Sequence, residues 1–293
     1  MLPPSVRVAI GLAALSVVYS SDVAHGSLFG VGSVAEHAEL GQIDTQTGAT
    51  TLIGPTAGIE LASSEGRLYS LDPRQVSEVP RRDGQFIRVD PATGATLETL
   101  GPPVVGHTIF GAIGMAIRSD KTVFLSISEV LDGDFGTLFD CGIFEACGPI
   151  KTVVPGMDGL AFNDADVLYG LSRHLPPGDA PQTADIHLYV LDPGGQTLIG
   201  STGIFGGIPD GKTLPSGLAF DPETGALYAG IGTSLYTIDV HTGAATLVGV
   251  TAFESISGLA FLTPVPEPEV AVFMLGALIT LAWSGHRLRR GPS

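Results

Sequence analysis

The segment Gly-Leu-Ala-Phe occurs three times in this chain, and no other feature of the sequence limits the possible folds as much. The three copies occupy residues 159–162, 217–220 and 258–261, and degenerate copies lie at 114–117 and 59–62. One short apolar segment that returns at intervals of 41 to 58 residues indicates that a single structural unit is used several times.

Each unit carries the signals of four short strands. The repeated segment is followed by an apolar–aromatic pair, then by a strand that ends in Asp, and then by a last strand in which apolar and small residues alternate. The pairs are 68–69, 123–124, 168–169 and 227–228; the strands ending in Asp are 86–90, 188–192 and 235–239; the last strands are 49–53, 95–100, 196–199 and 244–248. Four-stranded units of this length are typical of β-propeller blades.

The two ends of the repeat region complement each other. Residues 28–31, 40–44 and 49–53 supply the last three strands of a unit, and residues 258–261 supply a first strand with no unit after it. Pairing them completes a fifth blade and removes the exposed strand edges of an open ring. The sequence therefore predicts an all-β, five-bladed β-propeller over residues 27–263, closed by pairing of its N- and C-terminal strands. An open sandwich, or a six-bladed ring with one degenerate unit, would use the same strands.

The first 26 residues have the pattern of a secretion signal. Arg7 is the only charge ahead of an apolar run over 8–18, and small residues follow it. Eleven apolar residues suit a signal peptide and are too few to span a bilayer. We expect cleavage between residues 20 and 26, and the alternative is a buried first strand or helix.

The C-terminal 30 residues contain three signals in a fixed order. Pro266, Glu267 and Pro268 come first, an apolar run over 270–283 follows, and Arg287, Arg289 and Arg290 lie behind it. The arginines favour a cytoplasmic end, so the preceding chain would lie outside. A transmembrane helix over 270–285 is predicted, and its 16 residues would reach about 24 Å, which is short for a hydrocarbon core of about 30 Å. An ordinary single-pass anchor is the alternative to a transient one.

This order of Pro-Glu-Pro, apolar helix and basic end resembles the PEP-CTERM sorting signal. The resemblance covers only about residues 264–291. It implies that an exosortase-type processing protease removes the tail in the inner membrane of a Gram-negative bacterium that makes extracellular polysaccharide. The chain then divides into a signal peptide at 1–26, a repeat domain at 27–263 and a sorting signal at 264–293. It implies transit through the inner membrane, followed by the periplasm, the outer surface or the extracellular matrix.

The connections between the predicted strands differ in length on the two faces of the ring. Tight turns at 44–48, 90–94, 221–225 and 239–243 begin with Asp and end with Gly, and one carboxylate per turn favours a structural turn over a calcium site. The long connections, which are 73–84, 101–109, 128–136, 172–185 and 201–215, all fall on the other face. Such loops either carry binding residues or vary without constraint.

Cys141 and Cys147 are the two cysteines of the chain. In an exported protein an isolated pair favours a disulfide over a metal site, because zinc would need further thiol or imidazole ligands nearby. We therefore predict a disulfide between them.

The remaining chemistry-bearing residues form no catalytic constellation. His107, His174, His187 and His241 fall in different units, and Asp132 and Asp134 form the best isolated acidic pair. We therefore predict no catalytic, cofactor-binding or metal site, and no bound cofactor. A net charge of −16 argues against nucleic acid as a partner.

These signals favour an exported binding or structural module rather than an enzyme. Its partners would be the processing protease, the membrane during transit, and a polysaccharide or surface protein. The alternative is an extracellular propeller lyase or hydrolase that acts on sugars or phosphate esters. Such an enzyme needs at least two carboxylates, or His with Arg, converging at the mouth of the channel.

Overall fold

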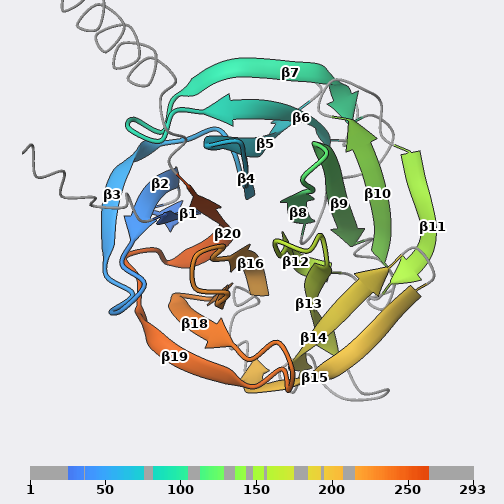
Figure 1. The fold of residues 1–293 in the computed structure, drawn as a ribbon. Helices are drawn as coiled ribbons and strands as arrows, with labels where there is room; N and C mark the ends of the chain where they lie inside the picture. Colours follow the sequence, from blue (N-terminus) through green and yellow to red (C-terminus); the bar gives the residue numbers. More distant parts are fainter. Residues whose placement is uncertain are drawn as a thin grey trace, which may run out of the picture.

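Five four-stranded antiparallel sheets surround a central axis as the blades of a β-propeller (Figure 1). The structure is a computed structural model that describes residues 26–35, 37–75, 82–104, 113–128, 136–142, 148–154, 157–174, 184–192, 195–206 and 215–263. No helix of these described segments is long and apolar enough to cross a membrane. The predicted transmembrane helix at 270–285 and the signal peptide lie outside them.

In blades 2 to 5 the strands run outward from the axis in chain order. Blade 2 contains β4 (Leu61–Ser64), β5 (Arg67–Gln75), β6 (Arg82–Val89) and β7 (Thr96–Val104). Blade 3 contains β8 (Ile113–Ile117), β9 (Thr122–Ser128), β10 (Gly136–Gly142) and β11 (Gly148–Val154). Blade 4 contains β12 (Met157–Phe162), β13 (Leu168–His174), β14 (Ala184–Asp192) and β15 (Gly195–Gly206). Blade 5 contains β16 (Pro215–Phe220), β17 (Leu227–Ile231), β18 (Ser234–Ile238) and β19 (Ala245–Val250).

The closing blade joins the two ends of the domain, as the sequence predicts. It orders β20 (Ser255–Leu262), β1 (Ser27–Val34), β2 (His37–Ile43) and β3 (Thr50–Pro55) from the axis outward. Leu28 pairs with Phe261, and Val31 pairs with Gly258. The prediction of five blades closed by the terminal strands is therefore confirmed.

The repeated glycines lie where neighbouring innermost strands approach closely. A Cβ added at Gly217 in β16 would lie 2.8 Å from the Cγ of Leu259 and 2.9 Å from its backbone nitrogen, in β20 of the next blade. Side chains from adjacent blades fill the space farther from the axis: Tyr69 and Leu71 of blade 2 share a core with Leu125 and Phe139 of blade 3. Burial of this apolar surface between blades stabilises the ring.

The tight turns are held by their own aspartates. In the turn after β2, Asp44 Oδ1 accepts hydrogen bonds from the backbone nitrogens of Gln46 at 2.8 Å and Thr47 at 2.9 Å. Gly48 completes the reversal with φ at +74°. These backbone hydrogen bonds lower the pKa of Asp44, and similar bonds lower the pKa values of Asp90 and Asp239.

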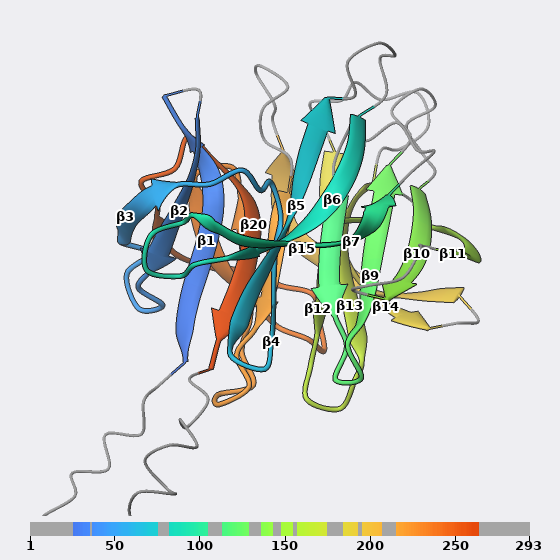
Figure 2. The ribbon, with the colours of Figure 1, turned by 90° about the horizontal axis from the view of Figure 1, so that it is seen from above.

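The two faces of the ring differ, as Figure 2 shows. One face carries the hairpin turns that join the two innermost strands of blades 2 to 5, and the described chain ends at Gly26 and Thr263 lie on it too. We call it the turn face. The segments 76–81, 129–135, 175–183 and 207–214 follow strand ends on the opposite face, the loop face, and they lie outside the described residues.

Candidate binding site at the central channel

The repeated segments build the wall of the central channel. Their residues form three layers contributed by the five innermost strands: Leu61, Met115, Leu160, Leu218 and Leu259; then Ala62, Ala116, Ala161, Ala219 and Ala260; then Ser63, Ile117, Phe162, Phe220 and Phe261. The cavity between these layers measures only about 70 Å³. The channel is therefore narrow and largely apolar along this stretch.

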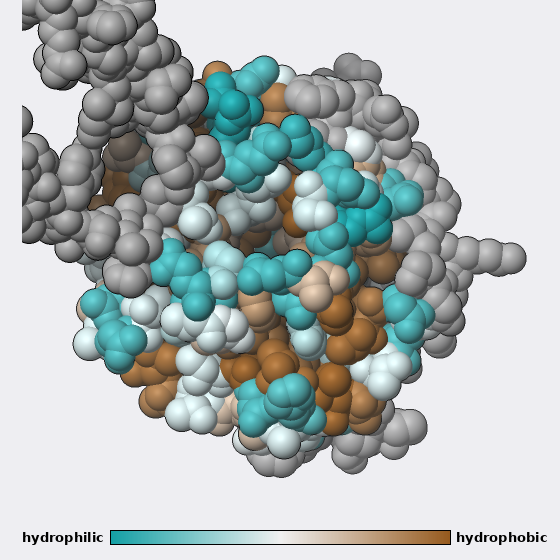
Figure 3. Space-filling view, in the orientation of Figure 1, coloured by the Kyte–Doolittle hydropathy of each residue, from teal (hydrophilic) through white to brown (hydrophobic). Residues whose placement is uncertain are grey.

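The channel widens at the turn face into a mouth of about 510 Å³. Phe162, Phe220 and Phe261 border its inner end, which we call the floor; Phe162 and Phe220 are half-buried and Phe261 is buried. Its rim carries polar side chains from the innermost hairpins of blades 2, 3 and 4, namely Glu65, Arg118, Ser119, Asn163, Asp164 and Asp166. Figure 3, which looks onto the turn face, shows a hollow near the centre of the ring with hydrophilic side chains around it.

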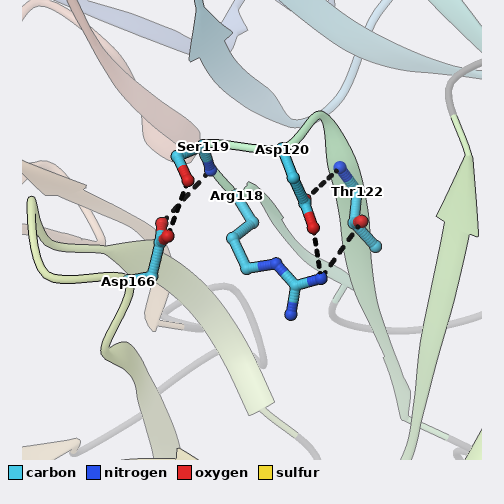
Figure 4. A network of polar contacts seen from close by, with 5 residues as sticks. All are labelled: Arg118, Ser119, Asp120, Thr122 and Asp166. Carbon is cyan, nitrogen blue, oxygen red and sulfur yellow. Dashed lines mark hydrogen bonds and ion pairs between the residues drawn. The ribbon is translucent and has the colours of Figure 1, made fainter.

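A polar network fixes the rim between blades 3 and 4 (Figure 4). Asp166 in the β12–β13 turn accepts hydrogen bonds from the backbone nitrogen of Ser119 at 3.2 Å and from its hydroxyl at 2.6 Å. Arg118 Nη2 donates to Asp120 Oδ2 at 2.5 Å and to the hydroxyl of Thr122 at 3.3 Å. The hydrogen bond to Asp120 is the main cause that raises the pKa of Arg118, so this guanidinium stays charged.

Three charged residues of these hairpins adopt backbone conformations that favour glycine. Glu65, Lys121 and Asp166 have φ angles of +50°, +73° and +57°. Glu65 and Lys121 also pair across blades 2 and 3 at 3.0 Å, although both side chains are more than half exposed, so the pair contributes little stability. Charged side chains thus stand at turn positions where glycine would cost less.

Two buried carboxyl groups lie toward the loop-face end of the channel. Glu60 directly precedes β4 and is 5% exposed, and Asp158 in β12 is 1% exposed. Burial raises the pKa of Glu60 well above its ordinary value, and the negative charge of Asp158 raises it further. Asp158 stands at an irregularity in the pairing of β12 with β13, between Met157 and Gly159. Irregularities of this kind redirect side chains.

Sequence reasoning missed this carboxyl pair, although a signal for one member was present. Glu60 occupies the place that Gly114, Gly159, Gly217 and Gly258 hold in the other copies of the repeat. A charged residue in a glycine position of an apolar repeat is unusual. Asp158 is likewise the only charge in its strand.

The described residues include only one cysteine of the predicted disulfide. Cys141 lies buried in β10 and is disulfide-bonded. Cys147 lies outside the described residues, so the Cys141–Cys147 pairing stays a prediction. The sorting residues Pro266, Glu267, Pro268, Arg287, Arg289 and Arg290 also lie outside them.

Two of the candidate histidines share a blade. His174 lies in β13 and His187 in the adjacent strand β14 of blade 4, so the expectation that these two fall in different units is wrong. His241 lies in the turn after β18, whereas His107, Asp132 and Asp134 lie outside the described residues. His187 in β14 contacts Asp185 at 2.9 Å, and Asp185 also accepts a hydrogen bond from the hydroxyl of Ser201 at 2.7 Å. No group of three or more His, Cys, Asp or Glu side chains within the described segments could hold a metal ion.

Comparison with known proteins gives structural likeness and no family. No family model matches the chain, and no curated protein does. Among solved structures, the nidogen/laminin complex contains a chain that is 11% identical with a TM-score of 0.48, over 81% of this chain and 98% of that one. A gluconolactonase from Xanthomonas campestris is 16% identical with a TM-score of 0.44, over 80% of this chain and 79% of that one. A protein of unknown function from Bacteroides caccae is 10% identical with a TM-score of 0.41, over 82% of this chain and all of that one. Likeness at this level transfers no function.

Proposed function

We propose that this chain is an exported propeller that acts as a binding module at the cell surface, and that its ligand enters the mouth on the turn face. The observation that carries the proposal is the combination of an aromatic floor and a polar rim around about 510 Å³ of space. Ligand sites are typically concave and largely apolar, with a few polar groups that are already in place. The hydrogen bonds of Asp166 and Arg118 hold this rim in position without a ligand.

The proposed export and processing of the chain depend on its two terminal segments. The signal peptide directs export, and an exosortase-type protease removes the tail near Pro266-Glu267-Pro268. Thr263 borders the mouth, and only six residues, 264–269, separate it from the apolar run. Six residues span at most about 20 Å. The anchored protein therefore holds its turn face toward the membrane, and removal of the tail frees the mouth for a polysaccharide or surface protein.

A glycan-array screen tests the binding function. The domain 27–263 is expected to bind at least one glycan, and Phe220→Leu is expected to weaken that binding about 2- to 10-fold, because it removes an aromatic surface and keeps an apolar one. Leu247→Ala is the matched control, since Leu247 is 56% exposed on outer strand β19. Equal losses in both variants, or no glycan bound at all, would count against the mouth as the site.

An enzymatic function is the second candidate, and the pair of Glu60 and Asp158 favours it. Burial, and secondarily the charge of Asp158, raises the pKa of Glu60, and a carboxylic acid with a raised pKa can act as a general acid. Turnover of a bound glycan or phosphate ester that Glu60→Gln abolishes would support this candidate over a pure binding module.

A further inference from the structure

Negative side chains outnumber positive ones around the mouth. Glu65, Asp164 and Asp166 place three carboxylates on the rim, and Arg118 is the only basic residue that borders it among the described residues. The guanidinium of Arg118 is already bonded to Asp120 and lies 5.3 Å from the centre of the Phe124 ring. An anionic ligand would therefore meet excess negative charge and a cation that is already paired.

The three rim carboxylates differ in whether they already have a partner within the protein. Asp166 accepts hydrogen bonds from Ser119, and Glu65 pairs with Lys121. Asp164 is exposed, and no side-chain contact of it is found within the described part of the chain. Asp164 can thus accept a charge-assisted hydrogen bond from a ligand without breaking a bond of the protein.

The residues of the floor indicate which apolar group the ligand carries. Phe162 and Phe220 are only half-buried, and both border the mouth. A phenyl ring offers a flat apolar face with a negative quadrupole, which suits the C–H face of a sugar ring and also attracts a cation. A ligand that packs against the phenyl rings and also binds the rim carboxylates combines a sugar ring with hydrogen-bond donors, at least one of them positively charged.

We propose that the mouth recognises an amine-bearing sugar unit, such as glucosamine within an oligosaccharide. This inference rests on the proposed binding function and specifies its ligand class. The sugar face lies against the phenyl rings, and the ammonium group faces the carboxylate of Asp164. Acidic saccharides are excluded by the charge of the rim.

The test is isothermal titration calorimetry of the domain 27–263 with three oligosaccharides of equal length. These are a glucosamine oligomer, its N-acetylated counterpart and an oligogalacturonate. At low salt the glucosamine oligomer is expected to bind about fivefold more tightly than the N-acetylated one, the scale of one exposed ion pair, and the difference should shrink as salt is added. The oligogalacturonate is expected not to bind.

Two variants locate the preference. Asp164→Asn should remove most of the fivefold difference and leave the N-acetylated oligomer unaffected. Glu98→Gln removes a carboxylate from outer strand β7, away from the mouth, and should change neither affinity. Thermal unfolding of both variants verifies that they remain folded.

The outcomes separate the amine preference from the binding function. Tighter binding of the oligogalacturonate, weakened by Phe220→Leu, would overturn the amine preference and leave the mouth as a binding site. Equal affinity for the amine and N-acetyl forms, unchanged in Asp164→Asn, would also overturn it. Binding of none of the three, together with an empty glycan array, would overturn the binding function itself.

Discussion

Replacing Gly258 by alanine is expected to destabilise the ring strongly, although the change adds only one methyl group. The added Cβ would lie 2.4 Å from the backbone nitrogen of Leu61 and 2.8 Å from the Cα of Glu60. Both atoms belong to the backbone of blade 2 or the residue before it, so the closing blade must move away. Overpacking of this kind typically costs 1–3 kcal/mol, and we expect about 3 kcal/mol, or a Tm lower by roughly 10 °C, in thermal unfolding followed by circular dichroism.

Gly26→Ala is the matched control for this prediction, and both variants are compared in a chain that starts a few residues before Gly26. A Cβ at Gly26 would lie 3.3 Å from the Cδ1 of Phe261, a side-chain atom that can shift, at the start of the described chain. We expect a change in Tm of about 2 °C or less. If the two variants unfold at the same temperature, the close approach of the closing blade to blade 2 is wrong.

Replacing Glu60 by glutamine is expected to raise the stability of the domain at neutral and alkaline pH. Burial, and secondarily the charge of Asp158, raises the pKa of Glu60 above its ordinary value of 4.5. The folded state therefore holds this proton more tightly than the unfolded state does. The resulting stability is fully present below about pH 4.5 and is lost as pH rises through the folded-state pKa. Glutamine has no charge to bury, so at pH 8 we expect a Tm higher by roughly 5 °C, which corresponds to about 1–2 kcal/mol.

The pH dependence of the Tm tests whether the buried charge of Glu60 causes this difference in stability. Near pH 4 the Tm of Glu60→Gln and that of the original domain should converge, because Glu60 is then protonated in both states. Asp158→Asn should reduce the pH dependence without abolishing it, since burial is the larger cause of the shift. Glu98→Gln, an exposed carboxylate on β7, should leave the profile unchanged. If the Tm of Glu60→Gln differs from that of the original domain by the same amount at every pH from 4 to 8, the buried charge of Glu60 is not the cause of the difference.

The repeat makes the architecture predictable because every innermost strand meets the same surroundings. Glycine is required where blades approach, and alanine where the channel narrows, so Gly-Leu-Ala-Phe returns in blades 4, 5 and the closing blade. Strand β11 (Gly148–Val154) carries no such signal, since it begins with Gly-Pro and lacks the alternating pattern of the other outer strands. The degenerate first copy corresponds to residues 60–63 rather than to the predicted 59–62, because Leu61, Ala62 and Ser63 line the channel as Leu160, Ala161 and Phe162 do.

The candidate site is less predictable, because it depends on contacts between units. Glu60 and Asp158 come from blades 2 and 4, and no spacing in the sequence reveals their proximity. Loop length favours the loop face, whereas the mouth lies on the turn face, where Phe162, Phe220 and Phe261 lie near the ends of the innermost strands. The expectation for the long loops stays a prediction, because most of them lie outside the described residues.

The propeller is expected to work outside the cell after it has lost its tail, and the proposed export and release from the membrane depend on this step. Intact-mass spectrometry of the protein isolated from its native host tests the step most directly. The predicted mass lacks the signal peptide, with cleavage between residues 20 and 26, and lacks everything from near Pro266 to Ser293. A native protein that retains a peptide covering residues 270–287 would contradict this processing and make the tail an ordinary membrane anchor.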